Sequence, residues 1–198
     1  MAAVGKLKLS RSAQHPDRLI MSWKGEIRPG MAKRIKSAFE KNKDKFTVIE
    51  FAIDSDGGSV REGRRVIDVL REIKKTHKLY TGVLAGRRCG SMCVFIYVQG
   101  EKRFAAPASI WLFHEVSRRD KKTKKIYELD REQWEALIDT YWLQAGVDPN
   151  WIEEMKRHTF QTDYYQTGQN LIEQHSGIVH KALSDERRRK VVPREKQQ

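Results

Sequence analysis

The alternation of strand-like and helix-like stretches is the feature that most constrains the fold of this chain. Apolar runs typical of strands occupy residues 19–23, 46–53 and 79–84. Helical spacing separates them, through Met31, Ile35 and Phe39 in the first gap and over 66–75 in the second. Strands that alternate with helices pair in parallel through right-handed crossovers. The order therefore predicts an α/β protein with repeated βαβ units and a parallel sheet.

A glycine pair follows the second of these strand-like runs. Gly57 and Gly58 stand between that run and the helical pattern over 66–75. Glycine permits the tight turn that points backbone N–H groups toward a ligand. Such a turn can supply one donor of an oxyanion hole, although a tight βα turn with no part in chemistry fits the same residues.

A serine and a histidine follow in the stretch Cys89–His114. Ser91 lies in a turn of small residues before the apolar helical run Met92–Val98, and His114 ends the strand-like run 110–113. A serine at a helix start lies near free backbone N–H groups, and a histidine can act as its base. Ligand sites in parallel sheets gather at the carboxyl ends of strands, where both residues are expected. The plain alternative is that Ser91 caps the helix and His114 only ends the strand.

These segments resemble the proteolytic subunit of Clp protease, within the wider Clp protease and crotonase superfamily. The glycine segment is IDSDGGSVREGRRVIDVLREIKK, the serine segment is CGSMCVFIYVQGEKRFAAPASIWLFH, and the resemblance runs from about residue 19 to 180. It implies a spiral of βαβ units with a parallel sheet and a protruding C-terminal helical handle.

The resemblance also implies a serine peptidase-like hydrolase that cleaves peptide bonds. Ser91 would be the nucleophile, His114 the base and Asp163 the third member of the triad. The backbone N–H groups of Gly58 and Met92 would form the oxyanion hole. Neither a metal nor an organic cofactor is implied.

Asp163 is matched because an aromatic residue, Tyr165, follows it two positions later. A helix cap is an equally good interpretation of Asp163. Asp148 and His158 are less well matched candidates for the same role.

Three departures from the family pattern leave other functions open. Asp56 replaces the proline of the family's glycine segment, no proline follows in His114-Glu115-Val116, and two cysteines flank the serine. The flanking cysteines resemble divergent bacterial Clp-protease-like proteins. A catalytically inactive, ring-forming binding module is therefore the alternative. A crotonase-like acyl-thioester enzyme fits less well, because its chemistry needs no such serine and histidine.

The two cysteines also bear on location. Cys89 and Cys93 are expected to be free, buried thiols, because an i, i+4 pair on a helix start is tight for a disulfide. The N-terminus lacks the apolar region of a secretory signal, and no apolar run is long enough to cross a membrane. The sequence therefore predicts a cytoplasmic protein, or an exported one if a leader has been removed.

The formal net charge of +13 is concentrated in the runs Arg118–Lys125 and Arg187–Lys196. We interpret both as solvated segments, which leaves an acidic partner or an unfoldase possible. Nucleic acid is an unlikely partner, because aromatic residues do not interleave the basic ones.

The expected domain organisation is a flexible leader over 1–17, one domain over 18–183 and a basic disordered tail over 184–198. A long helix is predicted over Leu129–Ala145, at the position of the family's handle. Its aromatic face suggests contacts in a homo-oligomer, either a ring or a dimer, although a place in the core is the alternative.

Overall fold

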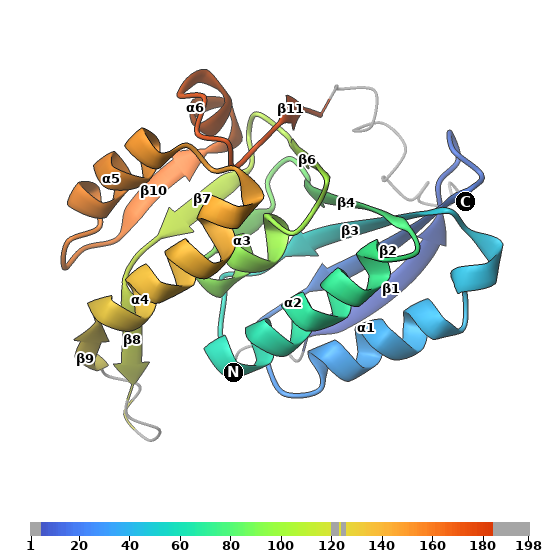
Figure 1. Ribbon diagram of the computed structural model, residues 1–198, viewed down its shortest axis with the longest axis horizontal. Coiled ribbons are helices and arrows are strands. Elements are labelled where there is room, and N and C mark those ends of the chain that lie inside the picture. The colour runs from blue at the N-terminus through green and yellow to red at the C-terminus, as the bar shows by residue number, and fades with distance from the viewer. Residues whose placement is uncertain (1–4, 120–122, 124–125, 184–198) are drawn as a thin grey trace, which may run out of the picture.

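A computed structural model describes residues 5–119, 123 and 126–183 of the 198-residue chain. Its larger sheet has six strands in the order β1-β2-β3-β4-β6-β11 (Figure 1). All neighbouring strands pair in parallel except β1 and β2. The strands are β1 Lys6–Arg11, β2 Arg18–Lys24, β3 Val48–Asp54, β4 Lys78–Val83, β6 Lys102–Ala105 and β11 Lys181–Ala182. The predicted parallel α/β architecture is confirmed.

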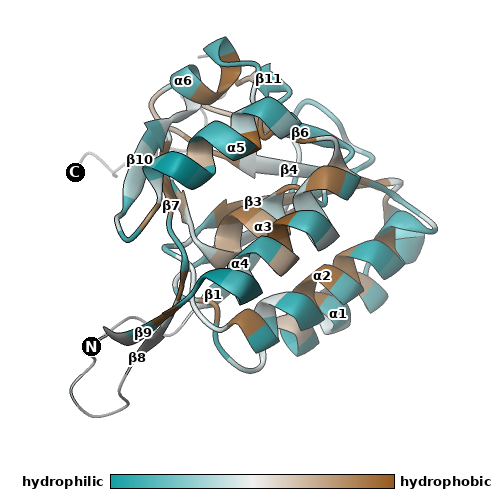
Figure 2. Ribbon diagram, turned by 60° about the vertical axis from the view of Figure 1, so that its left-hand side comes forward, coloured by the Kyte–Doolittle hydropathy of each residue, from teal (hydrophilic) through white to brown (hydrophobic). Residues whose placement is uncertain are grey.

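Helices α1 (Met31–Glu40) and α2 (Val60–Lys74) lie side by side along this sheet (Figure 2). Ser59 caps α2 by accepting a hydrogen bond from the Glu62 N–H at 3.2 Å. The buried Glu62 carboxylate then accepts the N–H groups of Gly30 and Ala32 at 3.1 and 2.9 Å. One acidic side chain thus serves the N-termini of both helices, where negative charge is favoured.

A second sheet has three strands in the order β10-β7-β5. These strands are β5 Arg88–Gly90, β7 Ile110–Phe113 and β10 Tyr164–Thr167, with β7 parallel to β5 and antiparallel to β10. Helix α3 (Met92–Tyr97) follows β5 directly, and all six of its residues are buried. A bridge between Ser55 and Cys89 joins the end of β3 to this smaller sheet.

The C-terminal part begins with a two-stranded ribbon, β8 (Val116–Arg119) and β9 (Ile126–Asp130). Helix α4 (Arg131–Leu137) then continues through a π-helical turn, η2 (Ile138–Trp142), and a 3₁₀ turn, η3 (Leu143–Ala145). The remaining helices are η1 Lys43–Lys45, α5 Pro149–His158 and α6 Gly168–Glu173.

The predicted handle is wrong in one respect: its aromatic face does not protrude. Trp134, Tyr141 and Trp142 are between 1 and 7% exposed. Trp142 stacks on Phe95 of α3, with ring centroids 4.8 Å apart. The helix over 131–145 packs against the serine helix, so these aromatic side chains belong to the core.

Two further boundaries differ from the expectation. Strand β1 lies within residues 1–17, which were expected to be a flexible leader, and it pairs with β2 from Lys6 to Arg11. Arg118 and Arg119, expected in a solvated loop, belong to β8. The expected disordered tail, 184–198, lies outside the described residues. Among the described helices, none combines the length and the apolar character that crossing a bilayer would require.

Candidate active site

Ser91 occupies the sharp turn between β5 and α3. Its backbone angles are φ 52° and ψ −126°, a conformation that residues with a Cβ rarely adopt. Its N–H donates to the Leu112 carbonyl of β7 at 2.8 Å, which fixes the turn to the neighbouring strand. Such strain costs about 1–3 kcal/mol and is concentrated at functional sites. A strained serine between a strand and a helix is the geometry of a nucleophile elbow.

The glycine pair lies directly against this serine. Gly57 and Gly58 have φ values of 106° and 139°. A Cβ added to Gly57 would stand 2.8 Å from the Ser91 Cβ, and one added to Gly58 would stand 2.4 Å from the Ile27 carbonyl oxygen. Only glycine fits either position. The turn is held in place because Ile27 N donates to the Gly57 carbonyl at 2.8 Å.

Two backbone donors at this turn have no acceptor within the described part of the chain. They are the N–H groups of Gly58 and Met92, the two expected members of the oxyanion hole. Met92 is the first residue of α3, where a helix leaves its N–H groups without intrahelical acceptors, and Gly58 is exposed. Both donors are therefore free to bind an oxygen of a ligand beside the strained serine.

The three-stranded sheet brings the ends that carry the expected triad to one edge. Ser91 follows β5, His114 follows β7 and Asp163 precedes β10. Because β7 is parallel to β5 and antiparallel to β10, these three ends lie at the same edge, with His114 on the middle strand. The pairing of Tyr164 with Phe113, extended by one residue, sets Asp163 opposite His114.

The side chains themselves are not joined by the hydrogen bonds of a triad. His114 Nδ1 lies 2.5 Å from the Glu115 backbone carbonyl. A carbonyl only accepts, so Nδ1 carries the proton and Nε2 presents its lone pair. Among the described residues, neither the Ser91 hydroxyl nor the Asp163 carboxylate forms a hydrogen bond, and Asp163 is exposed.

The expectation of free thiols is wrong, because Cys89 and Cys93 form a disulfide. Cys89 lies on β5 and not on the helix, and the turn at Ser91 brings the two Cα atoms to 5.3 Å. That distance is within the range for a disulfide. Both cysteines are fully buried, so the bond closes a small loop around Ser91 beneath the surface.

The acidic residues before the glycine pair neutralise the arginines that precede Ser91. Arg87 Nη1 lies 3.3 Å from Asp54 Oδ2, and Arg88 Nε lies 3.1 Å from Asp56 Oδ1. Asp56, which stands in place of the family's proline, therefore ties the glycine turn to β5.

Asp148 and His158, the less well matched candidates for the third member of the triad, have structural roles. Asp148 caps α5 by accepting from the Trp151 N–H at 2.8 Å. His158 stacks on Tyr164 with ring centroids 4.7 Å apart. Within the described residues, no cluster of three metal-binding side chains is present.

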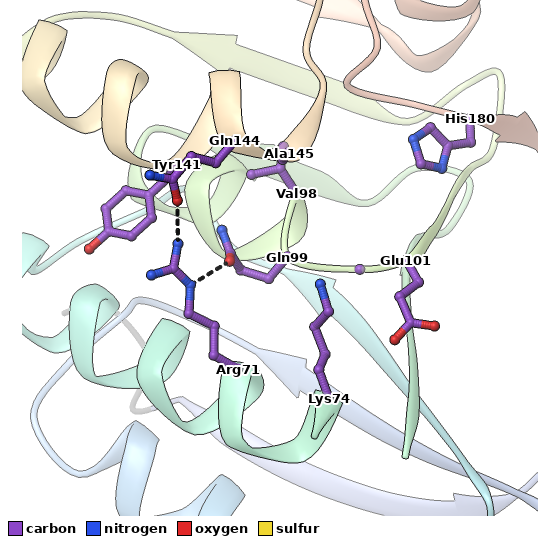
Figure 3. Close-up of a pocket in the computed structure, with 10 residues that line it drawn as sticks. Arg71, Lys74, Val98, Gln99, Glu101, Tyr141, Gln144, Ala145 and His180 are labelled. Atoms are coloured by element: carbon purple, nitrogen blue, oxygen red, sulfur yellow. Dashed lines mark hydrogen bonds between the residues drawn. The ribbon is translucent and has the colours of Figure 1, made fainter. Parts of the chain in front are cut away.

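A cavity of about 410 Å³ lies at the other end of α3, away from these residues (Figure 3). Arg71, Lys74 and His180 line it, and Arg71 is held by the side-chain oxygens of Gln99 and Gln144 at 3.3 Å each. Arg71 and Lys74 belong to the last turn of α2, where positive charge offsets the helix dipole. We assign the cavity no role at the candidate site.

The Clp protease family model matches residues 12–162. This match covers more than half of the 198 residues, and the chain belongs to the Clp protease family. No curated protein matches it. The family relation, expected from the glycine and serine segments, is confirmed.

Proposed function

We propose that the protein is a serine peptidase-like hydrolase in which Ser91 is the nucleophile and His114 is the general base. The observation that carries the proposal is the edge of the three-stranded sheet. There the strained serine, the histidine and an aspartate follow one another on adjacent strands. The order suits proton transfer, because the base lies between the nucleophile and the acid.

The proposed reaction begins when a peptide carbonyl enters the edge beside Ser91. The unprotonated Nε2 of His114 takes the hydroxyl proton as Ser91 Oγ bonds to the carbonyl carbon. The free N–H groups of Gly58 and Met92 then stabilise the oxyanion. Loss of one such donor typically costs ~10²–10³ in turnover. The histidine finally returns the proton to the leaving amine, and water hydrolyses the acyl-enzyme.

The family resemblance implies Asp163 as the third member of a triad, and the register sets it opposite His114, but its exposed carboxylate makes no hydrogen bond to the imidazole among the described residues. Directly opposite residues in an antiparallel pair bring their Cβ atoms within about 5.5 Å of one another. The substrates proposed are peptides or unfolded proteins. Assembly as a homo-oligomer, either a ring or a dimer, belongs to the same proposal, as does an unfoldase or an acidic partner.

The buried disulfide changes the proposed location. Stable disulfides persist in oxidising compartments and are rare in the cytosol. An exported protein fits this bond better than the cytoplasmic location expected from the sequence.

A specific observation favours one alternative, a catalytically inactive binding module. No hydrogen bond joins Ser91 to His114 in the described chain. Resting hydrolases often tighten such contacts only when substrate binds, so this observation alone does not exclude catalysis.

Labelling with a fluorophosphonate probe tests the proposal. The wild-type protein is expected to be labelled at Ser91, and Ser91→Ala is expected to abolish labelling without unfolding. Ser37→Ala, at an exposed serine of α1, is the matched control and should label like the wild type. Equal labelling of Ser91→Ala and the wild type would overturn the nucleophile. Silence of the wild type would favour the binding module.

A further inference from the structure

The orientation of the His114 ring depends on which group accepts its Nδ1 proton. Two acceptors are available at this edge of the sheet. The Glu115 carbonyl is at 2.5 Å from Nδ1, whereas the Asp163 carboxylate is exposed and makes no hydrogen bond in the described chain. The ring is therefore held by the backbone of its own neighbour.

The residue that provides this carbonyl is itself fixed by an ion pair whose carboxylate is buried and whose arginine is partly exposed. The side chain of Glu115 is 4% exposed, and its Oε1 lies 2.8 Å from Arg131 Nη1. A carboxylate this deep is rarely tolerated without a partner. Arg131 also donates from Nε to Glu135 Oε1 at 2.8 Å, so its guanidinium cannot rotate freely.

Arg131 is well placed to act as a clamp, because the chain on both sides of it is anchored. It is the first residue of α4, and the preceding Asp130 pairs with Val116 at the base of the ribbon. Its guanidinium lies over the rings of Trp134 and Phe160, at 6.0 and 5.5 Å from their centroids. Figure 1 shows that the β8–β9 ribbon follows β7 directly and leads into α4.

We infer that Glu115 and Arg131 are positioning residues that orient His114 through the Glu115 carbonyl, in place of the Asp163 side chain. This inference rests on the proposed function, since it concerns the base of that reaction. It also accounts for the missing proline after His114, because an ion pair here holds the segment 114–116. The ion pair thus fixes the tautomer in which Nδ1 carries the proton and Nε2 is the unprotonated nitrogen that acts as the base.

A neutral carbonyl does only part of the work of a carboxylate. It orients the imidazole and sets the tautomer, but it offers no full negative charge to the imidazolium that forms during catalysis. The protein should therefore be a slower hydrolase than one with an engaged aspartate, and Asp163 should be nearly dispensable.

The test compares the rate of fluorophosphonate labelling in four proteins. Asp163→Asn should stay within about threefold of the wild type. Arg131→Gln should slow labelling ~10–100-fold, because a misplacement of about 1 Å can cost ~10²-fold. The matched control is Arg18→Gln, which breaks another ion pair of an arginine with a buried glutamate, at 2.8 Å with Glu50 and beside a tyrosine ring. That variant should label like the wild type, since Arg18 begins β2 of the six-stranded sheet, whereas His114 follows β7 of the three-stranded sheet.

Two results would overturn the inference. One is a loss of ~10⁴-fold in Asp163→Asn, the size seen when a true triad aspartate is replaced. The other is wild-type labelling in Arg131→Gln. Arg131→Lys retains the charge without the forked geometry and should recover part of the rate, which also covers the case in which Arg131→Gln does not fold.

Nitrogen-15 NMR of the His114 ring tests the inference without a measurement of activity. The wild type should show a protonated Nδ1 and an unprotonated Nε2 at alkaline pH, and Arg131→Gln should shift the ring toward a mixture of tautomers. A protonated Nε2 in the wild type would overturn the inference. A wild type that shows the expected tautomer but no labelling would instead refute the proposed function.

Discussion

The two ends of helix α3 are built in opposite ways. At its carboxyl end the carbonyls are bonded: Thr81 Oγ1 donates to Tyr97 O at 2.8 Å, and Gln99 Nε2 donates to Phe95 O at 3.0 Å. The buried guanidinium of Arg103 donates to Val98 O at 3.1 Å. At the amino end Ser91 is strained, and the Met92 N–H has no acceptor in the described chain.

The carboxyl end has its own electrostatic cost. Burial lowers the pKa of Arg103 to about 10, and burial raises the pKa of Tyr97 well above its ordinary value. The fold accepts a buried cation there because it bonds two carbonyls, of Val98 and Ala145. Met92, the first residue of α3, has one of the N–H groups that every helix leaves without an intrahelical acceptor, and no side chain caps it. The amino end of α3 therefore keeps an open donor beside Ser91, whereas side chains cap its carboxyl end.

The largest effect is expected when the glycine turn is filled. In Gly58→Ala the new Cβ would collide with the Ile27 carbonyl, at a φ of 139°. We expect a loss of about 2–4 kcal/mol in the free energy of unfolding, together with loss of labelling. Urea unfolding and probe labelling measure the two effects.

Gly30→Ala is the matched control for that change. Gly30 also has a positive φ, 97°, but nothing lies within 4 Å of the added Cβ. Its cost should be backbone strain alone, about 1–2 kcal/mol, with labelling intact. Equal effects of the two variants would show that the close approach of Gly58 to the Ile27 carbonyl is unimportant.

Removing the cap at the other end of α3 should affect stability without affecting the site. Arg103→Met leaves the carbonyls of Val98 and Ala145 buried without this donor. Each unpaired group costs about 1–3 kcal/mol, and relief of the buried charge offsets part of this, so we expect a net loss of about 2–3 kcal/mol. Labelling of the folded fraction should change less than threefold. A collapse of labelling would show that the two ends are coupled.

Reduction of the disulfide should weaken the amino end. The bond closes a loop from Cys89 to Cys93, and cross-linking so short a loop contributes about 2 kcal/mol in the chain-entropy description. The double variant Cys89→Ala, Cys93→Ala should lose about that much and label more slowly, since Ser91 lies inside the loop. Mass spectrometry after alkylation checks the pairing in the isolated protein. Unchanged stability and labelling would show that the disulfide does not stabilise the turn at Ser91.

The smallest effect is expected from relieving the strain at the serine. Ser91→Gly should raise the free energy of unfolding by about 1 kcal/mol, because glycine adopts a positive φ without steric cost. His175→Gly relieves a φ of 49° elsewhere and should stabilise similarly while keeping full labelling. A destabilised Ser91→Gly would mean that the serine side chain supports the turn.

The βαβ order and the family relation both followed from local patterns in the sequence. The strand-like runs became β2, β3 and β4 because apolar periodicity and glycine turns are local signals. His114 after β7 was also predicted by a local pattern, but the three-residue strand β5, which directly precedes Ser91, was not. Strand β1 was missed although Lys6-Leu7-Lys8-Leu9 alternates, because the alternation covers only four residues. The strand is mostly exposed and exists mainly through pairing with β2.

Only the tertiary structure decided the contacts between distant segments. The aromatic face over 131–145 gave no sign of whether it met the core or a second copy, and its packing on α3 settled this. The positive φ of Ser91, which brings Cys89 to Cys93, depends on hydrogen bonding to β7. The residues of the Arg131–Glu115 pair are sixteen positions apart, so no periodicity in the sequence predicts their contact. Short-range patterns fix elements, whereas the bonds that orient a site depend on how those elements pack.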